Sequence, residues 1–238
     1  MTGSAEAGRK PVFLLDVDNT LLDNDRFAAD LGARLARDFG SAGRDRYWAL
    51  YSTLRDELGY ADYLATLQRL RREYADTPAL LGMSTFLLEY PFAERVYPNA
   101  LDAIARLDSL GLPVILSDGD IVFQPRKIQR SGLWDAVDGR VLITLHKENQ
   151  LDEVRARFPA RHYVMVDDKA DLLAAMKTRL GGALTTVHVR QGHYGHGNNE
   201  LAAPGRPDIV VDRIGDLIQL DAALLGAGGF DRVGPASF

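Results

Sequence analysis

Short, almost continuously apolar runs separated by helical patterns constrain the fold of this 238-residue chain more than any other feature. The runs occupy residues 12–15, 113–116, 141–145, 163–166, 185–189 and 209–211. A strand that is covered on both faces needs apolar side chains at consecutive positions, as in a parallel sheet. Helical patterns at 101–110, 121–130 and 171–180 lie before or between these runs. The alternation predicts an α/β fold with a doubly wound, mainly parallel sheet.

One long segment, from residue 26 to residue 97, interrupts this alternation. It lacks a strand pattern and carries apolar residues at helical spacing, for example Phe27, Leu31 and Leu35. We therefore expect a small helical domain at 23–97, inserted into a core that is built from 1–22 and 98–238. The tyrosines and arginines of this segment, including Tyr51 and Arg55, are expected to serve packing and solvated faces.

Composition narrows the classes of function. The formal net charge is −5, so no basic surface recruits nucleic acid or an anionic membrane. The absence of cysteine excludes disulfides, thiolate catalysis and cysteine zinc sites. The apolar run before Asp16 is too short for a signal sequence or a membrane span. We expect a cytoplasmic protein without nucleic-acid or membrane partners, and the sequence leaves the oligomeric state open.

Polar side chains gather where the expected strands end. Asp16 and Asp18 follow the first run, Ser117 follows the second, and Asp167 and Asp168 follow the run at 163–166. The carboxyl ends of parallel strands line a common crevice in an open sheet. Carboxylates that converge there repel one another unless a cation balances them, and oxygen ligands of this kind suit Mg²⁺. His193 and His196 lack a third ligand, so we expect no metal site in the glycine-rich loop 191–207.

These groups suggest phosphoryl chemistry. Asp16 beside a metal ion can attack phosphorus and form an aspartyl-phosphate, while Asp18 exchanges a proton with the leaving oxygen and then with water. Ser117 and nearby backbone amides can bind phosphate oxygens. A lysine should balance the charge, and the two candidates are Lys127 and Lys147. Asp23 and Asp25 are expected only to cap the first helix of the inserted segment.

Three motifs in this order resemble those of the haloacid dehalogenase-like superfamily, in its phosphatase branch. They are DVDNT at 16–20, LSDG at 116–119 and VDDKAD at 166–171. The resemblance implies a Rossmann-like core with a mobile helical cap of the C1 type between the first two motifs, which is where 26–97 lies. It also favours Lys147 over Lys127, because Lys147 stands between the second and last motifs at the family's spacing, whereas Lys127 lies within the helix after the second.

The resemblance assigns roles to individual residues. The catalytic group is Asp16, Asp18, Ser117 and Lys147. The metal ligands are Asp16, Asp18 through its backbone carbonyl, Asp167 and Asp168, with Asp168 binding directly or through water. The substrate-binding group is Thr20, Ser117, Asp118, Gly119 and Lys147. Asp171 is a supporting acid or only the N-cap of its helix.

The resulting hypothesis is a Mg²⁺-dependent phosphohydrolase that acts on a small phosphorylated metabolite through an aspartyl-phosphate. Asp18 stands where haloacid dehalogenases carry tyrosine, which argues against dehalogenation. Two alternatives stay open: a phosphotransferase or phosphomutase of the same fold, and a catalytically idle phosphate-binding or interaction protein. The residues do not identify the physiological substrate.

Overall fold

The fold is a single parallel sheet with helices on both faces, seen in a computed structural model that describes residues 10–74, 77–195 and 205–226. The strands lie in the order β3-β2-β1-β4-β5-β6, and every neighbouring pair is parallel. They are β1 Val12–Leu15, β2 Leu112–Asp118, β3 Val141–Thr144, β4 Tyr163–Asp167, β5 Leu184–Val189 and β6 Ile209–Val211. The predicted fold class is therefore confirmed.

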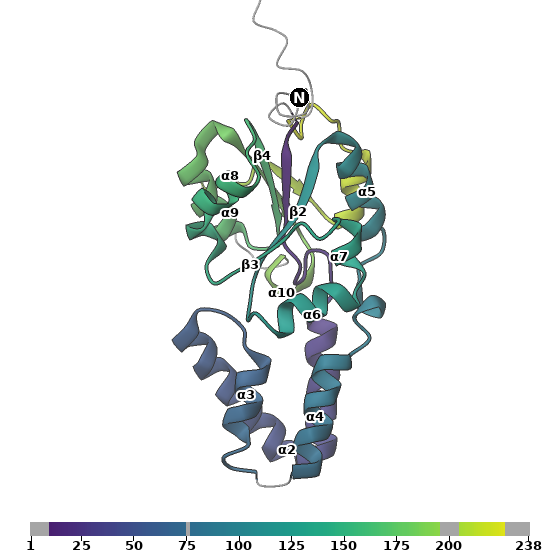
Figure 1. Cartoon of the computed structure of the whole chain (residues 1–238), viewed down its shortest axis with the longest axis vertical. Helices are drawn as coiled ribbons and strands as arrows, with labels where there is room; N and C mark the ends of the chain where they lie inside the picture. The colour runs from purple at the N-terminus through teal and green to yellow at the C-terminus, as the bar shows by residue number, and fades with distance from the viewer. Residues whose placement is uncertain (1–9, 75–76, 196–204, 227–238) are drawn as a thin grey trace, which may run out of the picture.

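Two helical layers cover the sheet. The layers comprise α5 Ala100–Leu110, α6 Phe123–Arg130, α7 Leu133–Ala136 and η4 Ile214–Gln219 on one side, and α8 Leu151–Arg157 and α9 Ala170–Leu180 on the other (Figure 1). Successive side chains of β1 divide between them, because side chains alternate across a strand. Leu14 belongs to the core cluster that includes Leu173, whereas Leu15 belongs to the one that includes Ile104. This two-sided burial explains the unbroken apolar runs in the sequence.

Several helices and strands begin or end at other residues than the sequence predicts, because polar groups or strand pairing determine their ends. β2 continues to Asp118 because its last residues pair with β3. The helix expected at 121–130 begins only at Phe123, after the carboxylate of Asp120 has accepted the backbone N–H groups of Val122 and Phe123. The prediction that Asp171 is an N-cap is wrong, because α9 begins at Ala170. Asp171 lies instead in the first turn, where a carboxylate favours the helix dipole.

Within its described residues, the inserted segment forms three α-helices beyond the carboxyl ends of the strands (Figure 1). They are α2 Asn24–Leu58, α3 Tyr63–Leu70 and α4 Thr77–Glu89. Asp23 caps α2 by accepting the backbone N–H of Arg26 at 2.9 Å, as predicted. A kink at Gly40, where φ is 73°, divides α2 and separates its two apolar faces.

The two connections to the inserted helices run side by side. Leu22 pairs with Val96 in an antiparallel bridge. The backbone N–H of Asp23 donates to Arg95 at 2.7 Å, and that of Tyr97 donates to Leu21 at 2.9 Å. The chain therefore leaves and re-enters the core at one place, and the division at residues 22 and 98 into two domains stays a prediction. Within the described ranges, no helix is both long and apolar enough to cross a membrane.

Candidate active site

The candidate site lies where the strand order reverses, between β1 and β4. Asp16 directly follows β1, and Asp167 is the last residue of β4. The backbone N–H of Asp16 donates to Val166 at 3.0 Å, so the two strand ends are locked in register. In an open parallel sheet, ligands bind in the crevice at this switch point.

Three buried carboxylates meet at this point. Asp16, Asp167 and Asp168 each offer an oxygen atom within 4.8 Å of the others. Asp168 is 1 % exposed, and neither of its oxygens has a hydrogen-bond partner among the described residues. A buried carboxylate without a partner is costly, and a hard divalent cation would satisfy it. The donor set therefore fits a metal ion of that type.

Burial and mutual repulsion shift the acidity of this cluster. Burial, reinforced by the charges of Asp167 and Asp16, raises the pKa of Asp168 to about 9. Burial also raises the pKa of Asp16 to about 6, although Lys147 opposes the shift. Both carboxyl groups thus bind protons more tightly in the metal-free fold than in the unfolded chain.

Lys147 supplies the positive charge beside Asp16. Its buried ammonium contacts the Asp16 carboxylate and lies 2.6 Å from Oδ2 of Asp167. Burial by itself would lower the pKa of Lys147, but attraction to these two carboxylates outweighs it and raises the pKa. Asp118 fixes the loop, because its Oδ1 accepts the backbone N–H of Lys147 at 2.9 Å and the hydroxyl of Thr144 at 2.6 Å. Those bonds make Asp118 a support for Lys147, and its predicted contact with substrate stays a prediction.

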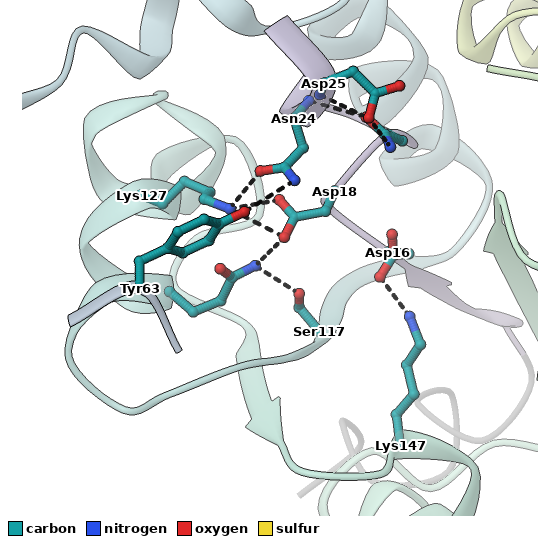
Figure 2. A network of polar contacts seen from close by, with 10 residues as sticks. Asp16, Asp18, Asn24, Asp25, Tyr63, Ser117, Lys127 and Lys147 are labelled. Atoms are coloured by element: carbon teal, nitrogen blue, oxygen red, sulfur yellow. Dashed lines mark hydrogen bonds and ion pairs between the residues drawn. The ribbon is translucent and has the colours of Figure 1, made fainter. Parts of the chain in front are cut away.

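The second aspartate of the DVDNT motif has a lysine of its own. The Nζ atom of Lys127 lies 2.8 and 3.0 Å from the two carboxylate oxygens of Asp18. Figure 2 shows that Asp16 and Asp18 point toward different lysines. Gln124 donates to the Ser117 hydroxyl at 2.9 Å and to Asp18 at 3.3 Å. The two lysines that compete as candidates in the sequence therefore contact different aspartates.

Other predicted residues surround this pair. Thr20 is buried, and its hydroxyl has no partner within the described residues. Gly119 has no room for a side chain, because a Cβ there would lie 2.8 Å from Cβ of Gln124. Lys169, which sequence reasoning missed, is adjacent to Asp168, and attraction to Asp16 and Asp167 overcomes burial to raise its pKa. Its place inside VDDKAD was the available signal.

The GHYG turn, α10 Gly192–Gly195, links the core to the inserted helices. His193 donates its backbone N–H to Asp25 at 2.8 Å. The prediction that Asp25 caps α2 is wrong, because Asp23 is the N-cap and Asp25 lies in the first turn of the helix. Arg55 of α2 donates to the Tyr194 hydroxyl at 2.6 Å. Arg55 was expected only on a packing or solvated face, so the contact was missed. His196 lies outside the described residues.

A cleft of about 450 Å³ lies between the inserted helices and the loops after β2 and β3. Its lining is Tyr60, Asp62, Leu64, Ala65 and Gln68 on one side and Gly119, Asp120, Ile121, Val122, Ile143, Thr144 and Leu145 on the other. Among these residues there are two carboxylates and no lysine or arginine. The cleft begins beside Gly119, two positions after Ser117.

A match to a protein-family model agrees with the motif order, the strand order and the buried carboxylates. The model of the haloacid dehalogenase-like hydrolases matches residues 11–178. The chain belongs to this family. The helices α2, α3 and α4 are accordingly called the helical cap below.

Solved structures show the same architecture. A haloacid dehalogenase-like hydrolase from Burkholderia xenovorans LB400 is 58% identical, with a TM-score of 0.85, covering 91% of this chain and 99% of that one. L-2-haloacid dehalogenase from Xanthobacter autotrophicus is 18% identical, with a TM-score of 0.57, over 88% of this chain and 97% of that one. The HAD-hydrolase YfnB from Bacillus subtilis, bound to magnesium, is 17% identical, with a TM-score of 0.58, over 89% and 98%. The last two show the fold alone, and no curated protein matches the chain.

Proposed function

We propose that this hydrolase is a Mg²⁺-dependent phosphatase that cleaves a small phosphate monoester through an aspartyl-phosphate on Asp16. The observation that carries the proposal is the buried carboxylate of Asp168, which lies beside Asp16 and Asp167 and has no hydrogen-bond partner among the described residues. With Asp168 protonated, as its raised pKa implies, the carboxylates of Asp16 and Asp167 balance the ammonium groups of Lys147 and Lys169, so the site has no surplus positive charge for an anionic substrate. A divalent cation reverses that balance.

Asp16, Asp167, Asp168 and the backbone carbonyl of Asp18 would hold the ion. When bound, Mg²⁺ supplies charge stabilisation to phosphoryl oxygens. The chain's own residues supply the rest of the proposed reaction. A carboxylate oxygen of Asp16 attacks phosphorus, and the bond from phosphorus to the ester oxygen breaks. Lys147 keeps the attacking carboxylate oriented and offsets part of its charge.

Asp18 is the proposed proton carrier. It gives a proton to the departing alcohol oxygen in the first step and takes one from water in the second. The water oxygen then attacks phosphorus, the bond to Asp16 breaks, and phosphate leaves with Asp16 restored. The Ser117 hydroxyl and the backbone of Gly119 are proposed to bind phosphoryl oxygens during both steps.

The cap-side cleft is proposed to receive the alcohol part of the ester. Its walls are largely apolar and its charged residues, Asp62 and Asp120, are both acidic. A second anionic group on the substrate would be repelled there, whereas a neutral or amine-bearing alcohol would be accepted. We therefore expect phosphate esters of neutral or amine-bearing alcohols to be better substrates than esters whose alcohol part carries a second phosphate or a carboxylate.

The test is phosphate release from p-nitrophenyl phosphate by the purified protein, with Mg²⁺ and with EDTA. Activity should require Mg²⁺, and acid quenching should trap phosphate on Asp16 for location by mass spectrometry. Asp16→Asn should lose activity at least about 1000-fold, because an amide is a poor nucleophile. An Asp16→Asn protein with full activity rules out the nucleophile.

Dehalogenation is the competing activity, because structural neighbours include L-2-haloacid dehalogenases. The same preparation should be offered an L-2-haloacid while chloride release is followed. Chloride release without phosphatase activity would replace the proposed function by dehalogenation. Absence of both activities would leave an idle, phosphate-binding protein as the better description.

A further inference from the structure

The ammonium of Lys127 is enclosed within the protein. Lys127 is 0 % exposed, although it lies on a short helix, α6, at the boundary between core and cap. Its Nζ atom reaches Asp18 at 2.8 and 3.0 Å and the Asn24 side-chain oxygen at 3.0 Å. An ammonium has about three protons to donate, so these contacts use its capacity. No proton of Lys127 is left for substrate or water.

Aromatic rings close the remaining sides of the ammonium. Its Nζ atom lies 5.3 Å from the ring centroid of Phe123, 5.7 Å from Phe27 and 5.8 Å from both Tyr63 and Phe92. Ring faces at this range attract a cation, more strongly in a desolvated site. The box also blocks rotation of Lys127 toward solvent. Two of its walls, Phe27 and Tyr63, belong to cap helices α2 and α3.

Asp18 is the freer partner of this ion pair. Its side chain is 29 % exposed, whereas that of Lys127 is fully buried. Lys127 and Gln124 occupy about three of the four lone-pair positions of a carboxylate, which leaves one open toward the site. Without Lys127, the carboxylate of Asp18 could rotate among several orientations, and only one would face the reacting oxygen.

We infer that Lys127 is a positioning residue for Asp18 and that the docked cap completes the box that holds Lys127 in place. Asn24, at the start of α2, reinforces this link, because it bonds Lys127 and approaches the Tyr63 hydroxyl at 3.4 Å (Figure 2). Asp18 therefore has its working orientation only when cap and core are together. The inference rests on the proposed phosphatase function, in which Asp18 transfers the proton.

If Lys127 only stabilised the fold, replacing it would lower activity equally on every ester. Removing one partner of an ion pair is costly when the other charge stays buried, but the Asp18 side chain is 29 % exposed and can be hydrated without Lys127. A neutral side chain in the aromatic box should thus preserve the fold while freeing Asp18. Lys127→Met is close in shape, and Lys127→Gln, which retains polar contacts without the charge, is the second variant if Lys127→Met does not fold.

The experiment compares two esters, p-nitrophenyl phosphate and a simple alkyl phosphate. Only the alkyl ester needs a proton from Asp18, because p-nitrophenolate leaves readily without one. Asp18→Asn should lose about 100-fold or more on the alkyl ester and much less on the activated one. Lys127→Met should show the same selective loss, of about 10- to 100-fold, and Lys127→Arg should recover part of it.

The double variant Asp18→Asn/Lys127→Met should be no slower than Asp18→Asn alone, since the two residues act through one group. Lys177→Met is the matched control, because Lys177 also pairs with a carboxylate, Asp208 at 2.8 Å, away from the site. It should leave both esters unaffected.

Equal losses on both esters for Lys127→Met and Lys127→Gln, or losses that add to those of Asp18→Asn, would overturn the positioning role and leave the phosphatase proposal intact. Wild-type protein inactive on both esters with Mg²⁺ would instead overturn the phosphatase proposal, and the positioning role with it.

Discussion

Asp168→Asn should stabilise the metal-free protein, although it removes a proposed metal ligand. The pKa of Asp168 rises from 3.8 to about 9 on folding, mainly through burial. Because the folded state binds the extra proton, stability from this group is present below the unfolded pKa and is lost as pH rises toward the folded pKa. The variant removes the titrating group, so its advantage should grow with pH.

The free-energy cost of keeping Asp168 protonated in the folded protein follows from the difference between the pH and the pKa of Asp168 in the unfolded chain. At about 1.36 kcal/mol per pH unit, this protonation costs on the order of 5 kcal/mol at pH 8 and about 1–2 kcal/mol at pH 5. A buried asparagine with poorly satisfied polar atoms costs about 1–3 kcal/mol. The net gain is about 2–4 kcal/mol at pH 8 and close to zero at pH 5. For a chain of this size, that gain corresponds to a melting temperature about 5–15 °C higher at pH 8.

The assay is thermal unfolding in EDTA at pH 5 and pH 8, repeated with Mg²⁺. Mg²⁺ should raise the melting temperature of the wild type more than that of Asp168→Asn, since a ligand stabilises the state that binds it. Asp56→Asn, at an exposed position of α2, controls for the general loss of one charge. The reasoning fails if Asp168→Asn melts at or below the wild type at pH 8 in EDTA, or if its advantage is independent of pH.

Three further changes test other parts of the site. Lys147→Met should lower phosphatase activity about 100-fold or more. It should also move the acid limb of the pH–rate profile to higher pH, because Lys147 lowers the pKa of Asp16, and an unmoved limb contradicts this. Arg55→Met and Tyr194→Phe should each raise KM by about two- to fivefold. In the double variant the combined effect should differ from the sum of the two single effects by up to about 1 kcal/mol, and additive effects would show that the 2.6 Å contact contributes nothing. Gly59→Ala should destabilise the protein by about 1–3 kcal/mol, because Gly59 has a φ of 80° and a Cβ would overlap the His146 ring. When His146→Ala is added to Gly59→Ala, unfolding experiments should show recovery of the steric part of that loss only, since the positive φ still disfavours alanine.

The sequence determined the strands and the motif positions because both are local properties. An unbroken apolar run followed by a carboxylate is enough to place Asp16 and Asp167 at strand ends, and parallel strands bring such ends to one edge. The order of the motifs also separated Lys147 from Lys127 as the partner of Asp16. The sequence could not show that Asp168 is buried without a hydrogen-bond partner among the described residues, since an exposed aspartate in a turn can have the same sequence neighbours.

Only the tertiary structure decided which charges meet. Lys127 and Asp18 are 109 positions apart, and Tyr194 and Arg55 are 139 apart, so no helical or strand period connects them. The aromatic box around Lys127 draws its rings from α2, α3, η1 Phe92–Arg95 and α6, which become neighbours only when the cap docks on the core. In the sequence Lys127 looks like any other charged residue on an amphipathic helix. It is buried because its charge partner and three of its four aromatic walls come from other parts of the fold.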